Sequence, residues 1–535
     1  MTAAPLAEIV QRRDLAFQLY EVLDLEALTR TGPFAEHGRA TFEAVLDTAE
    51  RIALERFAPL AARMDAHEPR IGEDGSVVLP AGVREALDDY FAAGFHLAHL
   101  SEEKGGMGLP LTVSQAAAAL FTGANPSLTA YPFLTIAAAN LLDAFGSEDH
   151  KRRYLAPMRE GRFFGTMCLS EPQAGSSLAD IRTRAEPIDG QEGRFRIRGN
   201  KMWISAGDHE LAENIVHLVL ARIEGAPAGV KGISLFIVPK FRVADDGRVG
   251  ERNDVKLAGL NHKMGYRGTT NCLLAFGDEG ECLGELVGEP NRGLAYMFHM
   301  MNEARIGVGL GAAVLGYAGY RHALAYARER LQGRPIGEKD PESPPVPIIR
   351  HADVRRMLME QKVHVEGALL LCLDAARIID LMTAGDDEEA ERRDHLLLEL
   401  LIPIVKAWPS HYGLKANALA IQVLGGYGYT RDFPLERLYR DNRLNPIHEG
   451  TNGIQSLDLL TRKVPMANGA AFRVLMEEMA DTVRRAGEDE MLREAAGSLE
   501  AAANLLSRTT VRLMKAMHEG RIEAASANSW RYLQM

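Results

Sequence analysis

A single carboxylate, Glu449, stands in the segment "NPIHEGTNGIQ" at 445–455, between the imidazole of His448 and a flexible run that begins at Gly450. A carboxylate in a Gly/Asn/Thr-rich break between two helix-forming segments can act as a general base, provided that the rest of the chain builds a site around it. A glutamate near a helix N-terminus can also simply stabilise the helix dipole, which is the usual role of an isolated glutamate there. The local sequence leaves both interpretations open.

Two short β-rich segments could bind a flat aromatic ligand. In "MCLSEPQAGSSLADI" at 167–181, a β-like run ends at Ser170 and a turn follows, which would expose N–H groups and hydroxyls to a phosphate or a flavin edge. In "GNKMWISAG" at 199–207, Trp203 could stack on an aromatic ring while Ser205 donates a hydrogen bond to it. An ordinary Ser/Gly turn and a half-buried tryptophan at a sheet edge also explain these segments.

Arginines and glycines in the C-terminal half suggest an anionic ligand. Arg305 in "MNEARIGVG" and Arg330 in "YARERLQGRPIG" each carry a planar guanidinium suited to phosphate, although most arginines at helix ends stay solvated. The run "QVLGGYGYTRDFPLERLYRD" at 422–441 places Gly425, Gly426 and Gly428 in a helical pattern, at a cost of roughly 1 kcal/mol per glycine. Such glycines indicate either a helix C-cap or the close approach of a ligand.

The composition is that of an ordinary globular protein. Its 535 residues suggest two to four domains, and its net charge of -12 argues against a nucleic-acid partner. The N-terminus lacks an apolar core of signal-peptide length, and the run at 307–320, the nearest to a membrane span, is too short. We therefore expect a cytoplasmic protein without a membrane span.

Neither the cysteines nor the histidines suggest a metal site. The four cysteines show no CxxC spacing, so neither a zinc site nor a disulfide framework is expected. His448 and the pair His96 and His99 lack further ligand candidates, and we expect them to be structural.

Apolar periodicity divides the chain into three blocks. Residues 36–158 follow the i, i+3, i+4 spacing of helices, and short β-rich runs at about 160–285 predict an antiparallel β domain. Helical patterns return from about 290, with a Pro-rich break at 337–348. This segregated order predicts an α+β fold rather than the alternation of a Rossmann fold. The expected parts are an N-terminal arm, 1–35; a helical N-terminal domain, 36–159; a middle β domain, 160–285; a C-terminal helical bundle, 286–465; and a helical C-terminal extension, 466–535.

Seven short segments occur in an order and at spacings that are typical of one enzyme family. They are "LSEPQAGSS", "KMWIS", "KMGYRGTTNCLLAF", "NEARIGVG", "QVLGGYGYTRDFP", "RD" and "HEGTNGIQ". In these segments the chain resembles the acyl-CoA dehydrogenases, flavoproteins that introduce a double bond between the α and β carbons of an acyl-CoA, and the similarity runs from about residue 40 to 465. "FQLYEVLDLEAL" near the N-terminus, "YARERLQGR" and the C-terminal extension are similar to the larger branch of the family, which includes dehydrogenases of 3-(methylthio)propanoyl-CoA.

The resemblance implies an architecture and partners. We expect a helical N-terminal domain, a middle β-barrel-like domain and a helical C-terminal bundle, with FAD at their junction and often at a subunit interface. The resemblance also implies a homo-oligomer, either a dimer or a tetramer, an acyl-CoA substrate, and an electron-transfer flavoprotein as the electron acceptor.

Roles follow for the residues at matching positions. Glu449 matches the catalytic base, and Arg305 matches the arginine near the thioester end and the pantetheine channel. Gly450 would let the backbone approach the substrate, and Ser176 would lie near the CoA moiety. The positions expected to contact FAD are Met167, Leu169, Ser170, Gly175, Ser176, Trp203, Ile204, Ser205, Thr451 and Asn452, with Arg330, Gln422, Gly425 and Gly426 serving the cofactor of a neighbouring subunit.

In the family, the base removes the α-proton of the thioester while a hydride passes from the β carbon to flavin N5. We expect desolvation to raise the basicity of Glu449 once substrate fills the cleft. Hydrogen bonds to the thioester oxygen would raise the acidity of the substrate. The family's donors for these bonds are a ribityl hydroxyl of the flavin and the backbone N–H of the base.

Three positions depart from the family pattern. Ser177 replaces the usual aspartate after "AGS", so the charge expected in that turn is missing. The usual Phe-Gly after the pyrophosphate arginine is shortened to "RLQGR", which makes Arg334 a rival to Arg330. His448 replaces the common tyrosine before the base, where it could modulate the pKa of Glu449 or shape the acyl pocket.

Other functions are compatible with the same fold. An acyl-CoA oxidase would use the same flavin, whereas a nitroalkane-oxidase-like enzyme is disfavoured by Glu449, because an aspartate is expected there. An AidB-like, DNA-associated relative would require a basic C-terminal tail. Residues 466–535 instead contain nine Lys/Arg and ten Asp/Glu.

Overall fold

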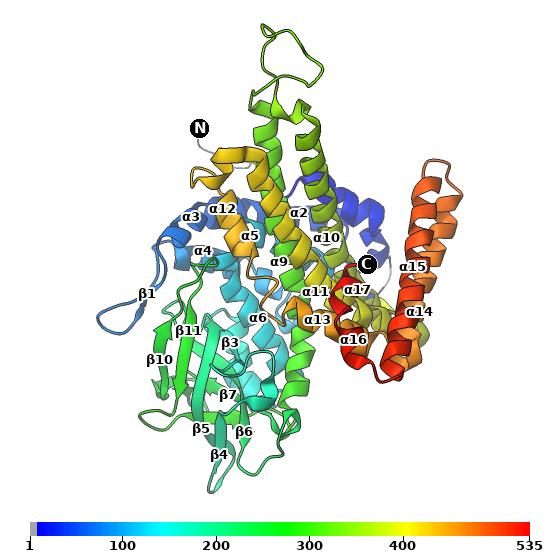
Figure 1. Ribbon diagram of the computed structural model, residues 1–535. Helices are drawn as coiled ribbons and strands as arrows, with labels where there is room; N and C mark the ends of the chain where they lie inside the picture. Colours follow the sequence, from blue (N-terminus) through cyan, green and yellow to red (C-terminus); the bar gives the residue numbers. More distant parts are fainter. Residues whose placement is uncertain (1–7, 31) are drawn as a thin grey trace.

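Helices make up both ends of the chain and strands its middle, which confirms the predicted α+β class (Figure 1). A computed structural model describes residues 8–30 and 32–535, with the backbone alone described at 299–301. The first described segment packs onto the C-terminal helices, where the Tyr317 hydroxyl donates to Asp14 at 2.8 Å and the Gln18 amide donates to the Glu366 carbonyl at 3.1 Å. It is therefore part of the helical core.

Two adjacent helices, α5 and α6, form the centre of the N-terminal helical region. Neither contains a charged residue before Asp143. The Oδ1 atom of Asn125 accepts from the Leu128 N–H at 3.2 Å and thereby starts α6. The elements of this region are α1 (Arg12–Ala16), α2 (Arg39–Ile52), α3 (Ala58–Ala66), β1 (Arg70–Ile71), β2 (Val77–Val78), α4 (Val83–Ala92), α5 (Leu111–Ala124), α6 (Pro126–Phe145), α7 (Glu148–His150) and α8 (Ala156–Arg159).

Among the described residues, α6 is the helix whose length and hydropathy would suffice to cross a membrane. The glycine-rich run at 307–320, expected from the sequence to be the nearest to a membrane span, is instead part of the helix Gly293–Glu329. Most of the apolar stretch of α6 is buried inside the protein, as expected for a core helix.

The middle domain closes into a barrel because β4 pairs with both β5 and β6. The closed ring runs β5, β12, β7, β6 and β4, and β11 and β10 extend the sheet from β5. Most pairs are antiparallel as predicted, but β3 and β4 both lie parallel to β6, because the long excursion between β3 and β6 allows a crossover. The strands are β3 (Phe163–Cys168), β4 (Arg184–Ile188), β5 (Gln191–Ser205), β6 (Asn214–Ile223), β7 (Ser234–Pro239), β8 (Phe241–Val243), β9 (Val249–Arg252), β10 (Val255–Leu260), β11 (Asn271–Phe276) and β12 (Leu283–Leu286).

Two long helices of the C-terminal region, α9 and α11, pack unusually closely. A Cβ atom at Gly309 would lie 2.0 Å from the Val405 carbonyl oxygen, and one at Gly413 would lie 2.3 Å from that of Ala312. Only glycine permits this approach of the two backbones. The helices of this region are α9 (Gly293–Glu329), α10 (Ala352–Ala384), α11 (Glu388–Leu424), α12 (Leu435–Asn442) and α13 (Asn452–Asp458).

The C-terminal extension forms a hairpin and then returns to the bundle (Figure 1). Its last helix packs on α13, where the hydroxyls of Ser456 and Ser529 share a hydrogen bond of 3.0 Å. Tyr532 and Leu533 are buried in an apolar cluster with Leu460. The helices of the extension are α14 (Met466–Gly487), α15 (Arg493–His518), α16 (Ile522–Ser526) and α17 (Ser529–Gln534).

The close packing of α9 and α11 gives a first prediction. Gly309→Ala should destabilise the protein by roughly 1–3 kcal/mol, because the added methyl group forces the two helices apart. Gly367→Ala in α10 is the matched control, since nothing lies within 4 Å of its Cβ position and alanine favours a helix. Thermal unfolding should show a lower midpoint for the first variant and an equal or higher midpoint for the control. Equal midpoints for Gly309→Ala and the parent protein would contradict the argument.

Candidate active site

Glu449 lies on a tight loop between α12 and α13 whose shape depends on two left-handed residues, Glu449 itself at φ 52° and Gly450 at φ 82°. The Gln455 amide donates to the Glu449 carbonyl at 3.1 Å, and a Cβ atom at Gly450 would lie 2.6 Å from that amide nitrogen. The Thr451 hydroxyl accepts from the Ile454 N–H at 3.3 Å and caps α13. Within the described part of the chain, the backbone N–H of Glu449 has no hydrogen-bond acceptor.

A chain of buried amides anchors this loop to the long helices. His448 Nε2 donates to Asn445 Oδ1 at 3.0 Å, and the Asn445 amide donates to Asn442 at 2.9 Å. The Asn442 amide donates to Asn417 Oδ1 at 2.7 Å and to the Ala312 carbonyl at 3.0 Å. Because the bonds of Asn442 join this end of α12 to both α9 and α11, the loop has little freedom to move.

Positive charges from two helices face Glu449. Burial raises the pKa of Glu449, while the charges of Arg305 on α9 and Lys406 on α11 oppose that rise. Arg305 is buried, with Nη1 3.6 Å from Asp458 Oδ2, and its Nε has no hydrogen-bond partner among the described residues. The site therefore contains a buried carboxylate whose pKa is raised and on which the positive charges of two side chains act.

His448 does not add to this charge. Burial and the nearby Lys406 charge lower the pKa of His448 to about 3, so its imidazole is neutral at physiological pH. Its ring instead packs edge-on against Tyr266, with centroids 6.4 Å apart. Of the two roles considered for His448, the packing therefore favours shaping the pocket over tuning the charge of Glu449.

The turn after β3 is held to β5 by a buried ion pair. Lys201 Nζ lies 2.9 Å from Glu171 Oε1, and the Thr183 hydroxyl donates to the same oxygen at 2.6 Å. Burial alone would raise the pKa of Glu171, but Lys201 and these hydrogen bonds lower it to about 2. The Met202 N–H also donates to the Ser170 carbonyl at 3.0 Å. The pair therefore fixes Ser170 beside the strand that carries Trp203.

Backbone strain is concentrated around these elements. Of the eight described non-glycine residues with positive φ, four belong to this region: Trp203, Ala206, Tyr266 and Glu449. Such conformations cost about 1–3 kcal/mol each and are concentrated at functional sites. The segment 261–271 connects the Glu449 loop to the strand that carries Trp203. Tyr266 packs against His448, and the Asn271 amide donates to the Ser205 hydroxyl at 3.2 Å.

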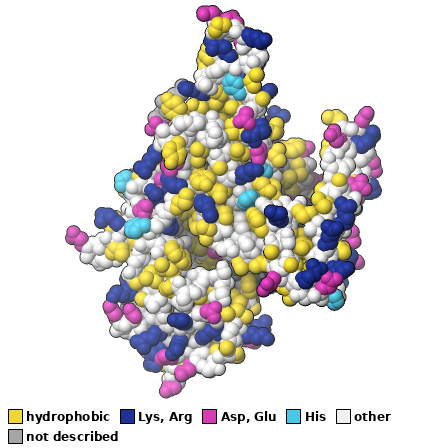
Figure 2. All heavy atoms as spheres, viewed as in Figure 1, with side chains coloured by type: hydrophobic (Ala, Val, Ile, Leu, Met, Phe, Trp, Pro, Cys, Tyr) yellow, Lys and Arg dark blue, Asp and Glu magenta, His cyan; other side chains and the backbone are white. Residues whose placement is uncertain are grey.

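The surface between the β domain and the helices is hollowed, with apolar side chains on its walls (Figure 2). Trp203 is 59% exposed, which is unusual for so large an apolar ring. Gly175 has open space around its Cβ position, and Ser176 is exposed on the same turn. These features fit the flat, partly polar ring system of a flavin.

A second group of predicted residues lies far from this hollow. Arg330 ends α9, about 37 Å along the helix from Arg305 at 1.5 Å per residue. Its guanidinium stacks over the Tyr427 ring at 5.6 Å, beside Gly425 and Gly426, whose Cβ positions are open. Gln422 is exposed at the same end of α11. Arg334, the rival, is instead bound to its own loop, where it donates to the Pro341 carbonyl at 2.7 Å.

Several predicted contacts need qualification. The Asn452 side chain is bonded to α11, and Ile204 is buried in the barrel core, so a direct flavin contact by either side chain stays a prediction. Ser177 donates to Asp180 at 3.1 Å, so a carboxylate is present in this turn although it comes from a different residue. His96, expected to be structural, donates from Nε2 to the Arg159 carbonyl at 2.7 Å.

Lys406 is the main residue that the sequence analysis missed. The available signal was a lone lysine within the apolar run "LLLELLIPIVKAW", where a helical face would bury it. Tyr266, in one of the seven matching segments, was also not singled out.

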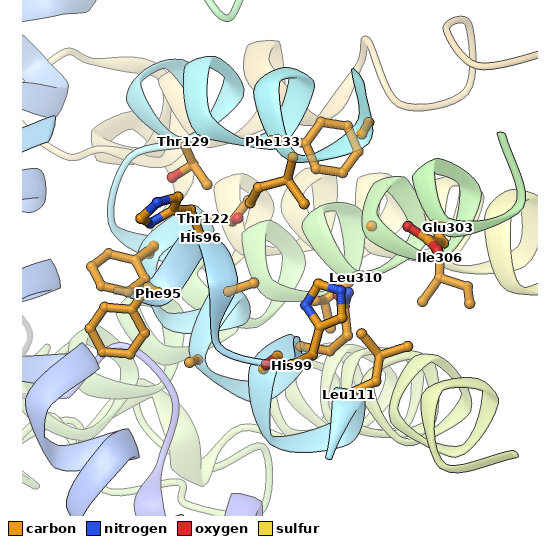
Figure 3. Close-up of a pocket in the computed structure, with 18 of the residues that line it drawn as sticks. Phe95, His96, His99, Leu111, Thr122, Thr129, Phe133, Glu303, Ile306 and Leu310 are labelled. Atoms are coloured by element: carbon orange, nitrogen blue, oxygen red, sulfur yellow. The ribbon is translucent and has the colours of Figure 1, made fainter. Parts of the chain in front are cut away.

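A cavity of about 100 Å³ lies between α5, α6 and α9 (Figure 3). Thr122 and Thr129 lie at one end of the cavity and Glu303 lies at the other (Figure 3). The Thr122 end lies near the Glu449 loop, because Gly311 faces both the Thr122 methyl and the Tyr266 hydroxyl. The rest of the lining is mixed: alanine, phenylalanine, leucine and isoleucine side chains alternate with polar ones such as Ser114, Gln115 and Asn140.

Three family models match successive parts of the chain. They are the acyl-CoA dehydrogenase N-terminal domain at residues 40–162, the middle domain at 166–278 and the C-terminal domain at 291–464. The chain therefore belongs to the acyl-CoA dehydrogenase family, and it is an oxidoreductase acting on a CH–CH group.

Within this family, the chain is 38% identical to the 3-methylmercaptopropionyl-CoA dehydrogenase of Ruegeria pomeroyi, over 88% of this chain and 78% of that protein. It is 33% identical to a butyryl-CoA dehydrogenase of Syntrophomonas wolfei, over 97% of this chain and 87% of the relative. A solved structure of Caenorhabditis elegans ACDH-11 in complex with C11-CoA shares the fold, with a TM-score of 0.80 at 20% identity over 100% of this chain and 88% of that one.

The buried ion pair gives a second prediction. Glu171→Gln should destabilise the protein by about 3–5 kcal/mol at pH 7, because it leaves Lys201 buried without a counter-charge. The pKa of Glu171 in the folded protein, about 2, lies below its ordinary 4.5, so the stabilisation is complete above about pH 4.5 and is lost as the pH falls towards 2. Urea unfolding across this pH range measures the effect. Glu186→Gln, at an exposed site on β4, is the control and should change little; an equal loss in both variants would contradict the prediction.

Proposed function

We propose that the protein uses FAD to oxidise an acyl-CoA thioester between its α and β carbons, with Glu449 removing the α-proton. The observation that carries this proposal is the Glu449 loop itself. Its carboxylate has a raised pKa, the charges of Arg305 and Lys406 act on it, and its backbone N–H has no acceptor among the described residues. A base and a hydrogen-bond donor thus come from one residue.

Glu449 is suited to this role because its environment opposes ionisation. Burial already raises its pKa, and an acyl chain that displaces water from the hollow would raise its basicity further. The positive charges of Arg305 and Lys406 oppose that rise and so favour the ionised carboxylate.

The α-proton also needs to become more acidic. A thioester oxygen placed against the unpaired Glu449 N–H would gain negative charge as the proton leaves, and a fixed donor stabilises that charge. Gly450 favours this approach, because its left-handed conformation at φ 82° and its lack of a side chain suit a close contact between the loop backbone and the substrate.

FAD would lie in the hollow between the β domain and the helices. Trp203 would pack against its ring, Ser205 and Thr451 would bind its polar edge, and Met167 and Ser170 would lie beside it. When bound, FAD supplies the hydride acceptor that the side chains lack. The exposed Trp203 ring and the open backbone at Gly175 support this placement.

We further propose a homo-oligomer in which Arg330, Gln422, Gly425 and Gly426 bind the FAD of a neighbouring subunit. The separation of about 37 Å between Arg305 and Arg330 along α9 supports this arrangement, because Arg330 is then too far from the Glu449 site, where Arg305 lies, to reach a flavin bound there. An electron-transfer flavoprotein is the proposed electron acceptor, as the family resemblance implies.

The cavity between α5, α6 and α9 is the proposed site of the acyl tail. A cavity of 150 Å³ holds benzene, so about 100 Å³ would hold roughly four heavy atoms beyond the reacting carbons. This size supports short and medium chains, which is consistent with the butyryl and 3-methylmercaptopropionyl substrates in the names of the two relatives.

Anaerobic bleaching of the bound flavin tests the proposed function. Butyryl-CoA, hexanoyl-CoA and 3-methylmercaptopropionyl-CoA should bleach the flavin of the parent protein. Glu449→Gln should lower the rate by at least about 10³-fold, because no group remains to accept the α-proton. Glu289→Gln, at an exposed carboxylate, is the matched control and should bleach at the parent rate.

The outcomes are distinct. No bleaching of the parent protein by any acyl-CoA would overturn the dehydrogenase proposal. Bleaching by Glu449→Gln at the parent rate would remove Glu449 as the base. Rapid stoichiometric oxygen uptake after bleaching would favour an oxidase.

The tail cavity gives a further prediction. Ala118→Leu should lower kcat/KM for octanoyl-CoA by about tenfold or more, because the larger side chain occupies space that the tail needs. Butyryl-CoA, whose chain barely enters the cavity, serves as the internal control and should react nearly as before. An equal loss for both substrates would contradict the assignment of the cavity to the tail.

A further inference from the structure

Lys406 is a buried cation that forms no ion pair with any described residue. Lys406 is 0% exposed, and no carboxylate of the described residues lies within 4.0 Å of its Nζ atom. Lysines are almost never fully buried unless they are paired. The position therefore requires a physical explanation.

The amide of Asn452 is oriented towards this ammonium group. Lys406 Nζ donates to Asn452 Oδ1 at 3.2 Å, and the Ser410 hydroxyl donates to the same oxygen at 3.0 Å. The Asn452 Nδ2 group donates to the Ala407 carbonyl at 3.3 Å, which fixes the orientation of the amide. Since Asn452 begins α13, directly after the Glu449 loop, Lys406 is tied to the base of that loop.

Glu449 is the carboxylate left to balance Lys406. Asp458 already pairs with Arg305 and Arg462, and Glu399 pairs with Lys463. His448 is neutral, and burial raises the pKa of Tyr266, which is therefore also neutral. The charged and titratable groups around Glu449 and Lys406 are thus Arg305 on α9, Glu399 on α11, Asp458 and Arg462 at α13, and His448 and Tyr266 on the two loops.

We propose that Lys406 is a positioning residue for the reaction: its ammonium group, held by Asn452, keeps Glu449 ionised until substrate arrives. The inference rests on the proposed role of Glu449 as the base. Burial lowers the pKa of Lys406 to about 7 although Glu449 opposes this, so the charges of the two groups depend on one another. After Glu449 takes a proton, Lys406 is left as a buried unpaired cation, which favours release of that proton once the product has left.

The pH profile of kcat/KM tests the proposal. Glu449 must be deprotonated to act, so activity falls below its pKa in the free enzyme. Lys406→Met removes a positive charge that favours the carboxylate, so the acidic limb should move to higher pH by roughly one unit or more. One unit below the parent's limb, kcat/KM should therefore fall by about a further factor of ten, while activity well above the limb should be retained.

Two variants separate charge from structure. Lys406→Arg keeps the charge and should restore the parent's limb. Ser410→Ala removes the other donor to Asn452 without changing any charge. The acidic limb of its pH profile should stay at the parent's pH even if kcat changes. Lys406→Met is expected to fold, because an apolar side chain of similar size often replaces a buried charge without loss of stability. Should it not fold, Lys406→Gln takes its place in the same assay.

Each result decides the question. The proposal is supported if the acidic limb of the pH profile moves to higher pH in Lys406→Met and returns to the parent's position in Lys406→Arg. An unchanged limb in the neutral variant, a uniform loss of activity at all pH values, or an equal shift in Ser410→Ala overturns it. If these results occur while Glu449→Gln is inactive, only this inference fails; if Glu449→Gln reacts at the parent rate, the proposed role of Glu449 as the base fails as well.

Discussion

The site depends on how closely α9 and α11 pack. At Gly309 the backbone of one helix meets the Val405 carbonyl of the other, with no room for a methyl group between them. Arg305 lies about one helical turn before that contact, and Lys406 directly follows Val405. Because Gly309 has no side chain, α9 and α11 pack closely, and this packing brings Arg305 and Lys406 from different helices towards Glu449. Wider spacing would let water between these charges and weaken their interaction.

Strained backbone at the site is supported by rigid polar networks on both sides of the hollow. On the helical side, the amide chain from Asn445 to Asn417 restrains the loop on which Glu449 has its unfavourable φ. On the barrel side, Glu171 and Lys201 hold the strand end where Trp203 is strained. Each network is buried and well bonded, which is the condition for a polar network to stabilise a unique geometry.

Much of this arrangement could be predicted from the sequence, because it depends on local patterns. Helical periodicity and short β runs gave the α+β class, and the ordered segments around Ser170, Trp203 and Glu449 identified the family. The role of Lys406 could not be predicted, because it depends on distant residues meeting across helices. The parallel pairing of β3 with β6 could not be predicted for the same reason, since periodicity shows that a strand exists but not which strand lies beside it.

The last residues of the chain have a practical consequence for handling the protein. Tyr532 and Leu533 are buried, and α17 lies against α13, the helix that directly follows the Glu449 loop. A truncation that removes the extension would expose Leu460 and its apolar neighbours and leave an aggregation-prone apolar surface on the bundle. Variants made for study should therefore keep α14–α17.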